Sequence, residues 1–457
     1  MDSVPADEIE QEEGSPGSGG RPLPRRALAR TARLASLPLG YAGRTTLGFG
    51  RRLVGRPADA VLTEVQARTA EQLFSVLGEL KGGAMKVGQA LSVFEAALPD
   101  EMVEPYRATL TRLQDAAPPM DAAAVHRMLA AELGPGWRRR FQHFDENPTA
   151  SASIGQVHRA VWADGRDVAV KVQYPGAGEA LRADLRQIQR AGSLLAGLFP
   201  NIDVKALVVE LRDRVGEELD YRLEAQAQAD FHRAFADDSE VLVPAVVDFT
   251  ERVLVTTWLD SVGSLSRLIA EGDEASRDHF GTAYVRFLFS GPSRTGMLHA
   301  DPHPGNFRML ADGRLGVVDF GAIARLGPDG LPRVVGRLLR RAVDDDWDAV
   351  LDGLRAEGFV KPGVDLDVDV LRDYLAPFVE PAKVDTFRFS REWLREQAER
   401  FNSPRKEAFV TATRLNLPPS YLLIHRVWSG GIGVLSQLGA EADFRTLLEE
   451  ALPGFND

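Results

Sequence analysis

Apolar residues recur along the chain with two different periods. Between residues 58 and 98 they stand three and four positions apart, which predicts helices broken at Gly82-Gly83. From about residue 141 to 259, short β-branched runs alternate with longer helical stretches. After residue 265 the helical period returns, except at 296–320, where Asp312-Gly313 predicts a hairpin turn between two apolar runs. The expected strands are 154–162, 167–173, 241–247 and 252–258, and the expected helices between them are 180–198 and 204–236.

This pattern predicts an α+β fold in which a small mixed sheet is followed by a helical half, with helical extensions at both ends. No internal repeat and no Gly/Ser linker divides the body of the chain. We expect four segments: an acidic tail and basic arm (1–57), a helical extension (58–140), a sheet lobe with inserted helices (141–262) and a helical lobe (263–457).

Charge is distributed unevenly along the chain. With 66 acidic and 54 basic residues the net charge is −12, which argues against nucleic acid as a partner. Residues 1–20 are rich in Asp, Glu, Gly and Ser and are expected to be disordered. Residues 14–58, in contrast, contain nine Arg and no acidic residue. This basic arm predicts either peripheral contact with an anionic membrane or a solvated basic segment.

Composition excludes some kinds of catalytic chemistry and limits where in the cell the protein is expected. The chain has no Cys, which excludes disulfides, thiolate nucleophiles and Cys-ligated metals. No apolar run reaches the roughly 18–20 residues that cross a bilayer, and Tyr421–Leu438, which contains His425 and Arg426, is expected to be a core helix. The acidic start is unlike a signal peptide. We expect a cytoplasmic protein, peripheral to the membrane at most.

The stretch from Met297 to Gly321 carries the clearest chemical signal. Phosphoryl transfer needs a carboxylate that positions the acceptor and oxygen ligands for the metal that bridges the nucleotide phosphates. Asp301 is suited to the first task, and Asn306 and Asp319 are suited to the second. Their spacings, five and thirteen residues, match the kinase catalytic loop and its D-F-G motif. The sequence therefore predicts a magnesium–nucleotide site.

Lys171 is the expected phosphate-binding cation. Only seven of the 54 basic residues are Lys, so a Lys at the end of Val168-Ala169-Val170 is informative, and it matches the kinase V-A-I-K strand. Its carboxylate partner is expected on the helix around residues 217–224. Helical spacing places Glu218 on a different face from the one shared by Glu217, Asp220, Tyr221 and Glu224. We therefore expect two Glu faces that can serve two different lysines.

Small residues stand where kinases carry a Gly-rich phosphate loop. Small side chains let backbone N–H groups approach phosphates, although Ala restricts the positive φ angles that Gly permits. We also expect Trp258, at the end of a predicted strand, to contact the nucleotide. The expected nucleotide-binding residues are Ala150, Ser151, Ala152, Ser153, Ile154, Gly155, Val157, Lys171 and Trp258.

With these motifs the chain resembles the UbiB/ADCK family of atypical protein-kinase-like proteins, from about residue 58 to 453. The specific marks are Lys86-Val87-Gly88-Gln89, the Ala-rich loop, the E-x-D-Y motif at 218–221, H-A-D-P-H-P-G-N and D-F-G. The resemblance implies a bilobal kinase-like fold that binds ATP or ADP with Mg, and a link to isoprenoid-quinone metabolism. It further implies that Lys86 and Gln89 lie across the active site, that Lys86 pairs with Glu218, and that Glu224 pairs with Lys171.

The leading hypothesis is an atypical kinase or ATPase that supports lipid or isoprenoid-quinone metabolism, with a lipid or isoprenoid substrate as a further partner. One alternative is a small-molecule kinase of the aminoglycoside or choline type, against which Lys86 to Gln89 and the Ala-rich loop argue. A second is a hydrolytic metal site formed by His299, Asp301 and His303. A third is a nucleotide-gated lipid-binding or assembly scaffold without turnover.

Overall fold

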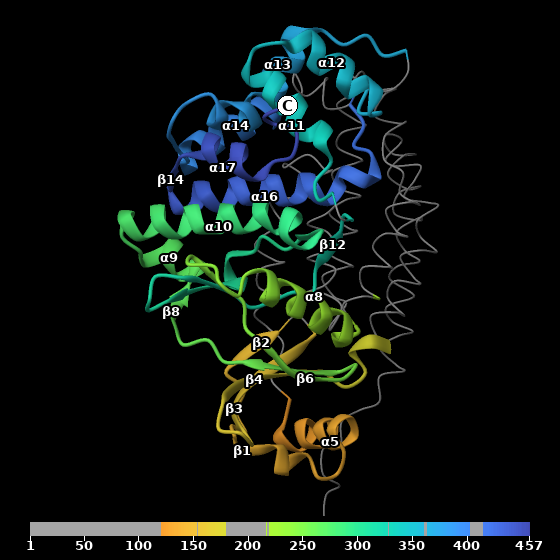
Figure 1. The fold of residues 1–457 in the computed structure, drawn as a ribbon, viewed down its shortest axis with the longest axis vertical. Coiled ribbons are helices and arrows are strands. Elements are labelled where there is room, and N and C mark those ends of the chain that lie inside the picture. The colour runs from red at the N-terminus through yellow and green to blue at the C-terminus, as the bar shows by residue number, and fades with distance from the viewer. Residues whose placement is uncertain are drawn as a thin grey trace, which may run out of the picture.

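The computed structural model describes residues 120–152, 154–179, 216, 219–327, 329–360, 363–402 and 415–457. These residues form two lobes stacked along the long axis of the molecule (Figure 1). The smaller lobe lies at the lower end of the view and contains the larger sheet. The larger lobe above it is mostly helical.

The smaller lobe is built on a six-stranded sheet in the order β1-β3-β4-β7-β6, with β2 paired to β3. Every pair in it is antiparallel, so the prediction of a mixed sheet was wrong for this lobe. The predicted strands 154–162, 167–173 and 252–258 are confirmed within a residue at either end. The elements are α5 (Ala122–Leu133), η1 (Trp137–Arg140), β1 (Phe141–Phe144), β2 (Ala150–Ala152), β3 (Gly155–Trp162), β4 (Asp167–Gln173), α8 (Tyr221–Ala234), β6 (Val246–Phe249) and β7 (Val253–Thr257).

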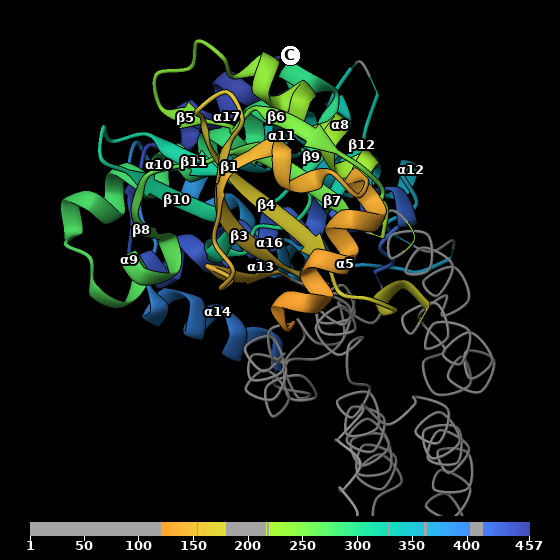
Figure 2. The same ribbon diagram turned by 90° about the horizontal axis from the view of Figure 1, so that it is seen from below.

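Alternation along β4 separates the two faces of this sheet. Val168, Val170 and Val172 are fully buried against the apolar side of α5, which crosses the outer face of the sheet (Figure 2). Helix α5 therefore packs as part of this lobe, although the sequence had placed it in the helical extension. The intervening residues, Lys171 among them, face the other way, toward α8 and the larger lobe.

Helix α8 lies between the sheet and the larger lobe (Figure 1). It begins at Tyr221 because Asp220 adopts an extended conformation and its carboxylate accepts a hydrogen bond from Arg222 N. The predicted helix 204–236 is thus wrong at Asp220, where the helix that carries Glu224 begins anew. Residues 180–198, the other predicted inserted helix, lie outside the described residues.

The predicted strand 241–247 is two strands. Pro244 has no N–H to donate to a sheet, and the chain changes sheet at that point. β5 (Val241–Leu242) pairs in parallel with β11 of the larger lobe, whereas β6 joins the sheet of the smaller lobe. The apolar pattern alone did not reveal this division, because valines stand on both sides of Pro244.

The larger lobe is organised around the buried helix α10, beside which α16 runs (Figure 1). The predicted core helix 421–438 is confirmed as α16, and the hairpin at 296–320 is confirmed as β10 and β11. The elements are β5, β8 (Ser261–Ser264), α9 (Leu265–Glu271), α10 (Glu274–Thr295), β9 (Met297–His299), η2 (Pro304–Asn306), β10 (Phe307–Leu310), β11 (Leu315–Val317), β12 (Ile323–Arg325), α11 (Arg333–Val343), α12 (Trp347–Ala356), α13 (Val368–Val379), η3 (Glu380–Ala382), β13 (Phe387–Arg388), α14 (Arg391–Asn402), η4 (Pro419–Tyr421), α16 (Leu422–Leu438), β14 (Glu441–Ala442) and α17 (Phe444–Ala451).

Three small sheets complete this lobe. One has the order β5-β11-β10-β8, and the other two are the pairs β12-β9 and β13-β14. Within the described residues, none of the helices combines the length and the apolar character that a membrane span requires.

Candidate active site

Lys171 and two carboxylates meet between the lobes. Lys171 Nζ donates to Glu224 Oε1 at 2.6 Å and lies 3.6 Å from Asp319 Oδ2. The three side chains come from β4, from the first turn of α8 and from the loop after β11. Because the Lys171 and Glu224 side chains are only 15% and 4% exposed, each charge needs its partner.

Burial acts to lower the pKa of Lys171, but the negative charges of Asp319 and Glu224 outweigh it and raise the pKa well above the ordinary Lys value. Lys171 is therefore a permanent cation at physiological pH. The ring of Tyr221, which begins α8, lies 5.1 Å from Nζ and adds a cation–π contact. The pairing of Glu224 with Lys171 that the resemblance implied is present in the structure.

Strand register shows what else shares the face of Lys171. Val157 is directly opposite Lys171 on β3, and Ala169 lies two residues before it on β4. Trp258, just beyond β7, follows the same alternation and has the guanidinium of Arg159 5.0 Å from its ring centre. Val157 and Trp258, two of the residues predicted to bind the nucleotide, are thus brought to the face that carries Lys171.

Most of the predicted Ala-rich loop forms strand β2, which pairs with β3 in a hairpin. Ala150, Ser151 and Ala152 pair with Val157, Gln156 and Gly155 in order. None of the described residues between 148 and 155 has a positive φ, so Ala and Ser replace Gly there without strain.

Gly155 is required in this hairpin for a different reason. A Cβ at this position would lie 2.2 Å from Val172 O of β4. Tyr174 N, directly after β4, donates a hydrogen bond to Ile154 O at 2.8 Å. The tip of the hairpin is thereby held against the end of β4.

The catalytic loop connects β9 to β10 through η2. Asn306 Nδ2 donates to Asp301 Oδ2 at 2.8 Å, which leaves the amide oxygen of Asn306 for another ligand. His303 Nδ1 accepts from Gly305 N and caps η2. Tyr284 of α10 donates its hydroxyl to Pro302 O at 2.8 Å. The loop is therefore fixed on both sides of Asp301.

Asp319 is positioned by the residues that follow it. Gly321 N donates to Asp319 Oδ1 at 2.9 Å. Phe320 is buried and packs on Phe231, two turns after Glu224 on α8, with ring centres 5.1 Å apart. Because one helix contacts both Lys171 and Phe320, it fixes the position of the D-F-G segment relative to Lys171.

His299 serves the fold of the loop. Its Nε2 donates to Asp319 O at 2.5 Å, and burial lowers its pKa, so the ring is neutral. The hydrogen bond of His299 Nε2 goes to Asp319 O, and that of His303 Nδ1 comes from Gly305 N, so neither of these bonds involves Asp301. Within the described part of the chain, no three His, Asp or Glu side chains are grouped so that they could hold a metal. The hydrolytic site of His299, Asp301 and His303 therefore has no support in the structure.

Asn306 and Asp319 fit a magnesium ion that is shared with phosphates. Val318 N donates to Asn306 O at 3.0 Å, so the two ligand-bearing segments are in direct contact. The amide oxygen of Asn306 and the carboxylate of Asp319 are the kind of hard oxygen ligands that Mg²⁺ prefers, and phosphates and water would complete its coordination. Four predicted residues, Lys86, Gln89, Ser153 and Glu218, lie outside the described residues.

Sequence reasoning missed Arg426 as a site residue. Its Nη2 lies 3.6 Å from Asp301 Oδ1, although it comes from α16 near the end of the chain. The available signal was that α16 contains one Arg and no Lys, Asp or Glu, and we took that Arg only as evidence against a membrane span.

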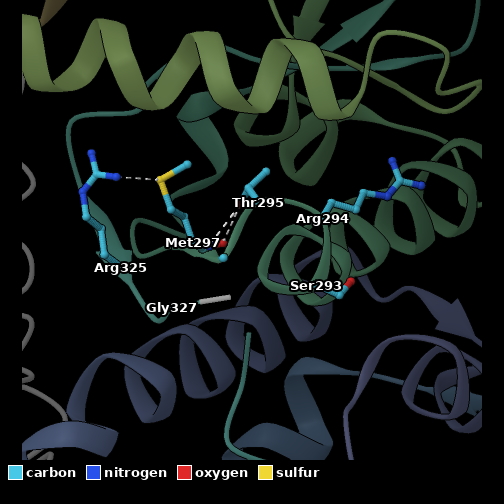
Figure 3. A pocket seen from close by; sticks show the side chains of 7 residues that line it. Ser293, Arg294, Thr295, Met297, Arg325 and Gly327 are labelled. Carbon is cyan, nitrogen blue, oxygen red and sulfur yellow. Dashed lines mark hydrogen bonds between the residues drawn. The ribbon is translucent and has the colours of Figure 1, made fainter. Parts of the chain in front are cut away.

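A cavity of about 440 Å³ opens at the C-terminal end of α10 (Figure 3). Arg325 faces it and donates to Met297 Sδ at 3.5 Å, while Arg294 extends away and pairs with Asp238. None of the predicted site residues that the structure describes lines it, so we assign it no part in phosphoryl chemistry. Its lining residues are Ser293, Arg294, Thr295, Gly296, Met297, Arg325 and Gly327.

Comparison with known proteins identifies relatives of this site. Residues 112–353, more than half of the chain, match the ABC1 atypical kinase-like domain. The mitochondrial atypical kinase coq-8 of Caenorhabditis elegans is 31% identical over 356 residues, which are 74% of this chain and 46% of that protein. The chloroplastic protein ACTIVITY OF BC1 COMPLEX KINASE 3 of Arabidopsis thaliana is 31% identical over 358 residues, 77% of this chain and 48% of the relative. The chain spans about half the length of these curated relatives.

A solved structure is also similar. That of Rv3197 from Mycobacterium tuberculosis in complex with erythromycin is 44% identical in sequence, with a TM-score of 0.68. The match covers 88% of this chain and 100% of the other.

Proposed function

Since this chain belongs to the family of ABC1 atypical kinase-like proteins, we propose that it binds Mg-ATP or Mg-ADP and transfers or hydrolyses a phosphoryl group. The family resemblance that the motifs indicated is confirmed, and so is the bilobal protein-kinase-like fold. With the family established, the aminoglycoside- or choline-type kinase is no longer needed as an explanation of the catalytic loop.

One observation carries the proposal. Lys171 Nζ lies 2.6 Å from Glu224 Oε1 and 3.6 Å from Asp319 Oδ2, so a phosphate-binding cation and a metal-binding carboxylate serve the same small volume. Lys171 binds phosphate oxygens there, and Glu224 holds its ammonium in place. Asp301 orients the hydroxyl of the acceptor or the attacking water, and its own orientation is set by the hydrogen bond from Asn306.

Asn306 and Asp319 are the residues that would hold magnesium. A bound Mg²⁺ supplies charge neutralisation for the phosphate oxygens. The protein contributes geometry: the contact between Val318 N and Asn306 O and the hydrogen bond from Gly321 N keep both ligands oriented.

The first test is nucleotide binding measured by thermal shift. Wild type should be stabilised by Mg-ADP, because a ligand at about 100 times its Kd adds about 2.7 kcal/mol to the free energy of unfolding. Asp319→Asn should lose that shift, whereas Asp312→Asn, at the exposed hairpin turn, should retain it. An unchanged shift in Asp319→Asn would contradict the metal assignment, and no shift in wild type would contradict the function.

We further propose that this phosphoryl transfer or hydrolysis supports lipid or isoprenoid-quinone metabolism at a membrane surface. Support comes from the names of relatives, an atypical kinase of mitochondria and a BC1 complex kinase of chloroplasts, and from the nine Arg of the basic arm. A deletion strain should lose a specific lipid or quinone, and wild type but not Asp301→Asn should restore it.

Flotation of the protein with anionic vesicles should fall when residues 21–56 are removed, and equal flotation would refute membrane contact by the basic arm.

A second candidate function is ligand binding without turnover, as a nucleotide-gated scaffold. The observation that favours it is the relative Rv3197, which is 44% identical and was solved with erythromycin, a large amphiphilic molecule. Calorimetry with erythromycin, in the presence and absence of Mg-ADP, tests it. Affinity that depends on the nucleotide, combined with no phosphate release from Mg-ATP, would favour the scaffold over the enzyme.

A further inference from the structure

The C-terminal helix α16 reaches the catalytic loop through a charged side chain. Arg426 Nη2 lies 3.6 Å from Asp301 Oδ1, and the two side chains are only 15% and 12% exposed. Within the described part of the chain, this is the one polar contact of the Arg426 guanidinium. A guanidinium withdrawn from water is costly unless an opposite charge compensates it, and Asp301 supplies that charge.

The backbone around this contact is packed tightly. Gly430 lies one turn after Arg426 on the same face of α16. A Cβ on Gly430 would be 2.5 Å from Cγ of Pro302, the residue that follows Asp301. On the other side, the hydroxyl of Tyr284 from α10 holds Pro302 O. The loop is thus confined between α10 and α16, and the distance from Arg426 to Asp301 is set by packing.

The neighbours of Arg426 on α16 have other tasks. The His425 ring lies against Phe378, with ring centres 6.1 Å apart, and Trp428 packs edge-on against Phe289 at 5.0 Å. Both belong to the core of the lobe. Arg426 is therefore the side chain by which this part of the helix approaches the proposed reaction centre.

Asp301 has a different partner at each oxygen. Oδ2 accepts from Asn306, and Oδ1 faces Arg426 at a separation longer than a hydrogen bond. The carboxylate cannot rotate without losing one partner, yet Oδ1 keeps room for the hydroxyl that it must orient. The positive charge also offsets the repulsion between this carboxylate and the phosphates of a bound nucleotide.

We propose that Arg426 is a positioning residue of the active site, which orients the Asp301 carboxylate and offsets its charge, so that α16 is part of the catalytic machinery. The inference rests on the proposed function, because Asp301 must orient an acceptor for its position to affect turnover. It predicts a loss in the catalytic step with little change in nucleotide binding, since Lys171 and Asp319 hold the nucleotide independently of α16.

The test compares Arg426→Gln and Arg426→Lys with Arg445→Gln, whose Arg pairs with Glu449 on the surface of α17. Steady-state phosphate release from Mg-ATP yields kcat and KM, and the thermal shift with Mg-ADP reports nucleotide binding. We expect kcat to fall at least about tenfold in Arg426→Gln, with KM and the Mg-ADP shift unchanged within about twofold. Arg426→Lys keeps the charge but not the planar fork and should recover part of kcat. The control variant should match wild type.

A double mutant shows whether Arg426 acts through Asp301. If it does, Arg426→Gln should lower the residual rate of Asp301→Asn by no more than about twofold. A wild-type kcat in Arg426→Gln, or a full additional loss in the double mutant, overturns the inference. If Arg426→Gln does not fold, Arg426→Lys decides: a kcat reduced at least about threefold with an intact Mg-ADP shift supports it, and an unchanged kcat overturns it. Absence of turnover and of nucleotide binding in wild type would instead refute the proposed function.

Discussion

Replacing Glu224 by Gln is the most direct probe of the site, because it removes one charge of a buried pair and changes little else. The ammonium of Lys171 lies 2.6 Å from Glu224 and 3.6 Å from Asp319. At an effective dielectric constant of about 20, the attraction to Glu224 is about 6 kcal/mol before desolvation is counted. Breaking a buried pair on one side costs about 3–5 kcal/mol. Since Asp319 remains and Gln keeps an acceptor oxygen, we expect a loss near the lower end, about 3 kcal/mol.

The assay is urea unfolding followed by far-UV circular dichroism, with Glu271→Gln as control. Glu271 forms an exposed pair with Arg267 one turn away on α9, so its loss should cost no more than about 0.5 kcal/mol. Mg-ADP should also stabilise Glu224→Gln less than wild type, because Lys171 then turns toward Asp319 and competes for the metal ligand.

The direction of the pH dependence follows from the raised pKa of Lys171. A group whose pKa is higher in the folded protein stabilises fully below its unfolded pKa, about 10.4 for Lys, and loses its contribution only as the pH rises through the folded value. The difference between wild type and Glu224→Gln should therefore be the same at about pH 6 and about pH 8. Equal unfolding midpoints and equal Mg-ADP shifts in both proteins would refute the reasoning.

Two further predictions concern the sheet lobe. Gly155→Ala should lower the stability of the protein by at least about 2 kcal/mol, because its Cβ would meet a backbone oxygen of β4. The control is Gly178→Ala, whose Cβ would make an ordinary contact at 3.4 Å and should leave Tm unchanged or raised. Similar Tm values for the two variants would contradict the packing argument. Burial lowers the pKa of His158, whose Nε2 faces the side-chain amide of Gln156, so the stability of the protein should fall as the pH drops below about 6.5. The slope of the urea unfolding midpoint against pH should therefore be shallower in His158→Gln than in wild type. An identical slope would exclude His158 as a cause of the pH dependence.

Much of the candidate site could be predicted because its chemistry is written in local spacing. Asp301, Asn306 and Asp319 lie in one continuous stretch, where a loop and a hairpin leave few arrangements. The assignment of Glu224 to Lys171 needed the family resemblance. Helical periodicity alone left several carboxylates open, and the N-cap at Asp220, which ends the apparent helix face, is not visible as a period.

Predictions failed where a residue's environment comes from distant segments. The division of 241–247 between two sheets depends on which strands lie on either side of Pro244, and the antiparallel order of the sheet depends on how β3, β4 and β7 meet. Neither property is encoded in the alternation of a single strand, which is the same for parallel and antiparallel neighbours when one face is buried.

The sequence by itself indicated the family and most of the strands and helices around the candidate site, because motif spacing and hydrophobic period act over a few residues. The pairing of Lys171 with Glu224 came from the family resemblance, and only the tertiary structure revealed that Arg426 lies against Asp301. In both cases, packing of a helix, α8 or α16, brings together side chains that are far apart in the chain. Electrostatic pairing depends on distance in space, and that distance exists only after the core has assembled.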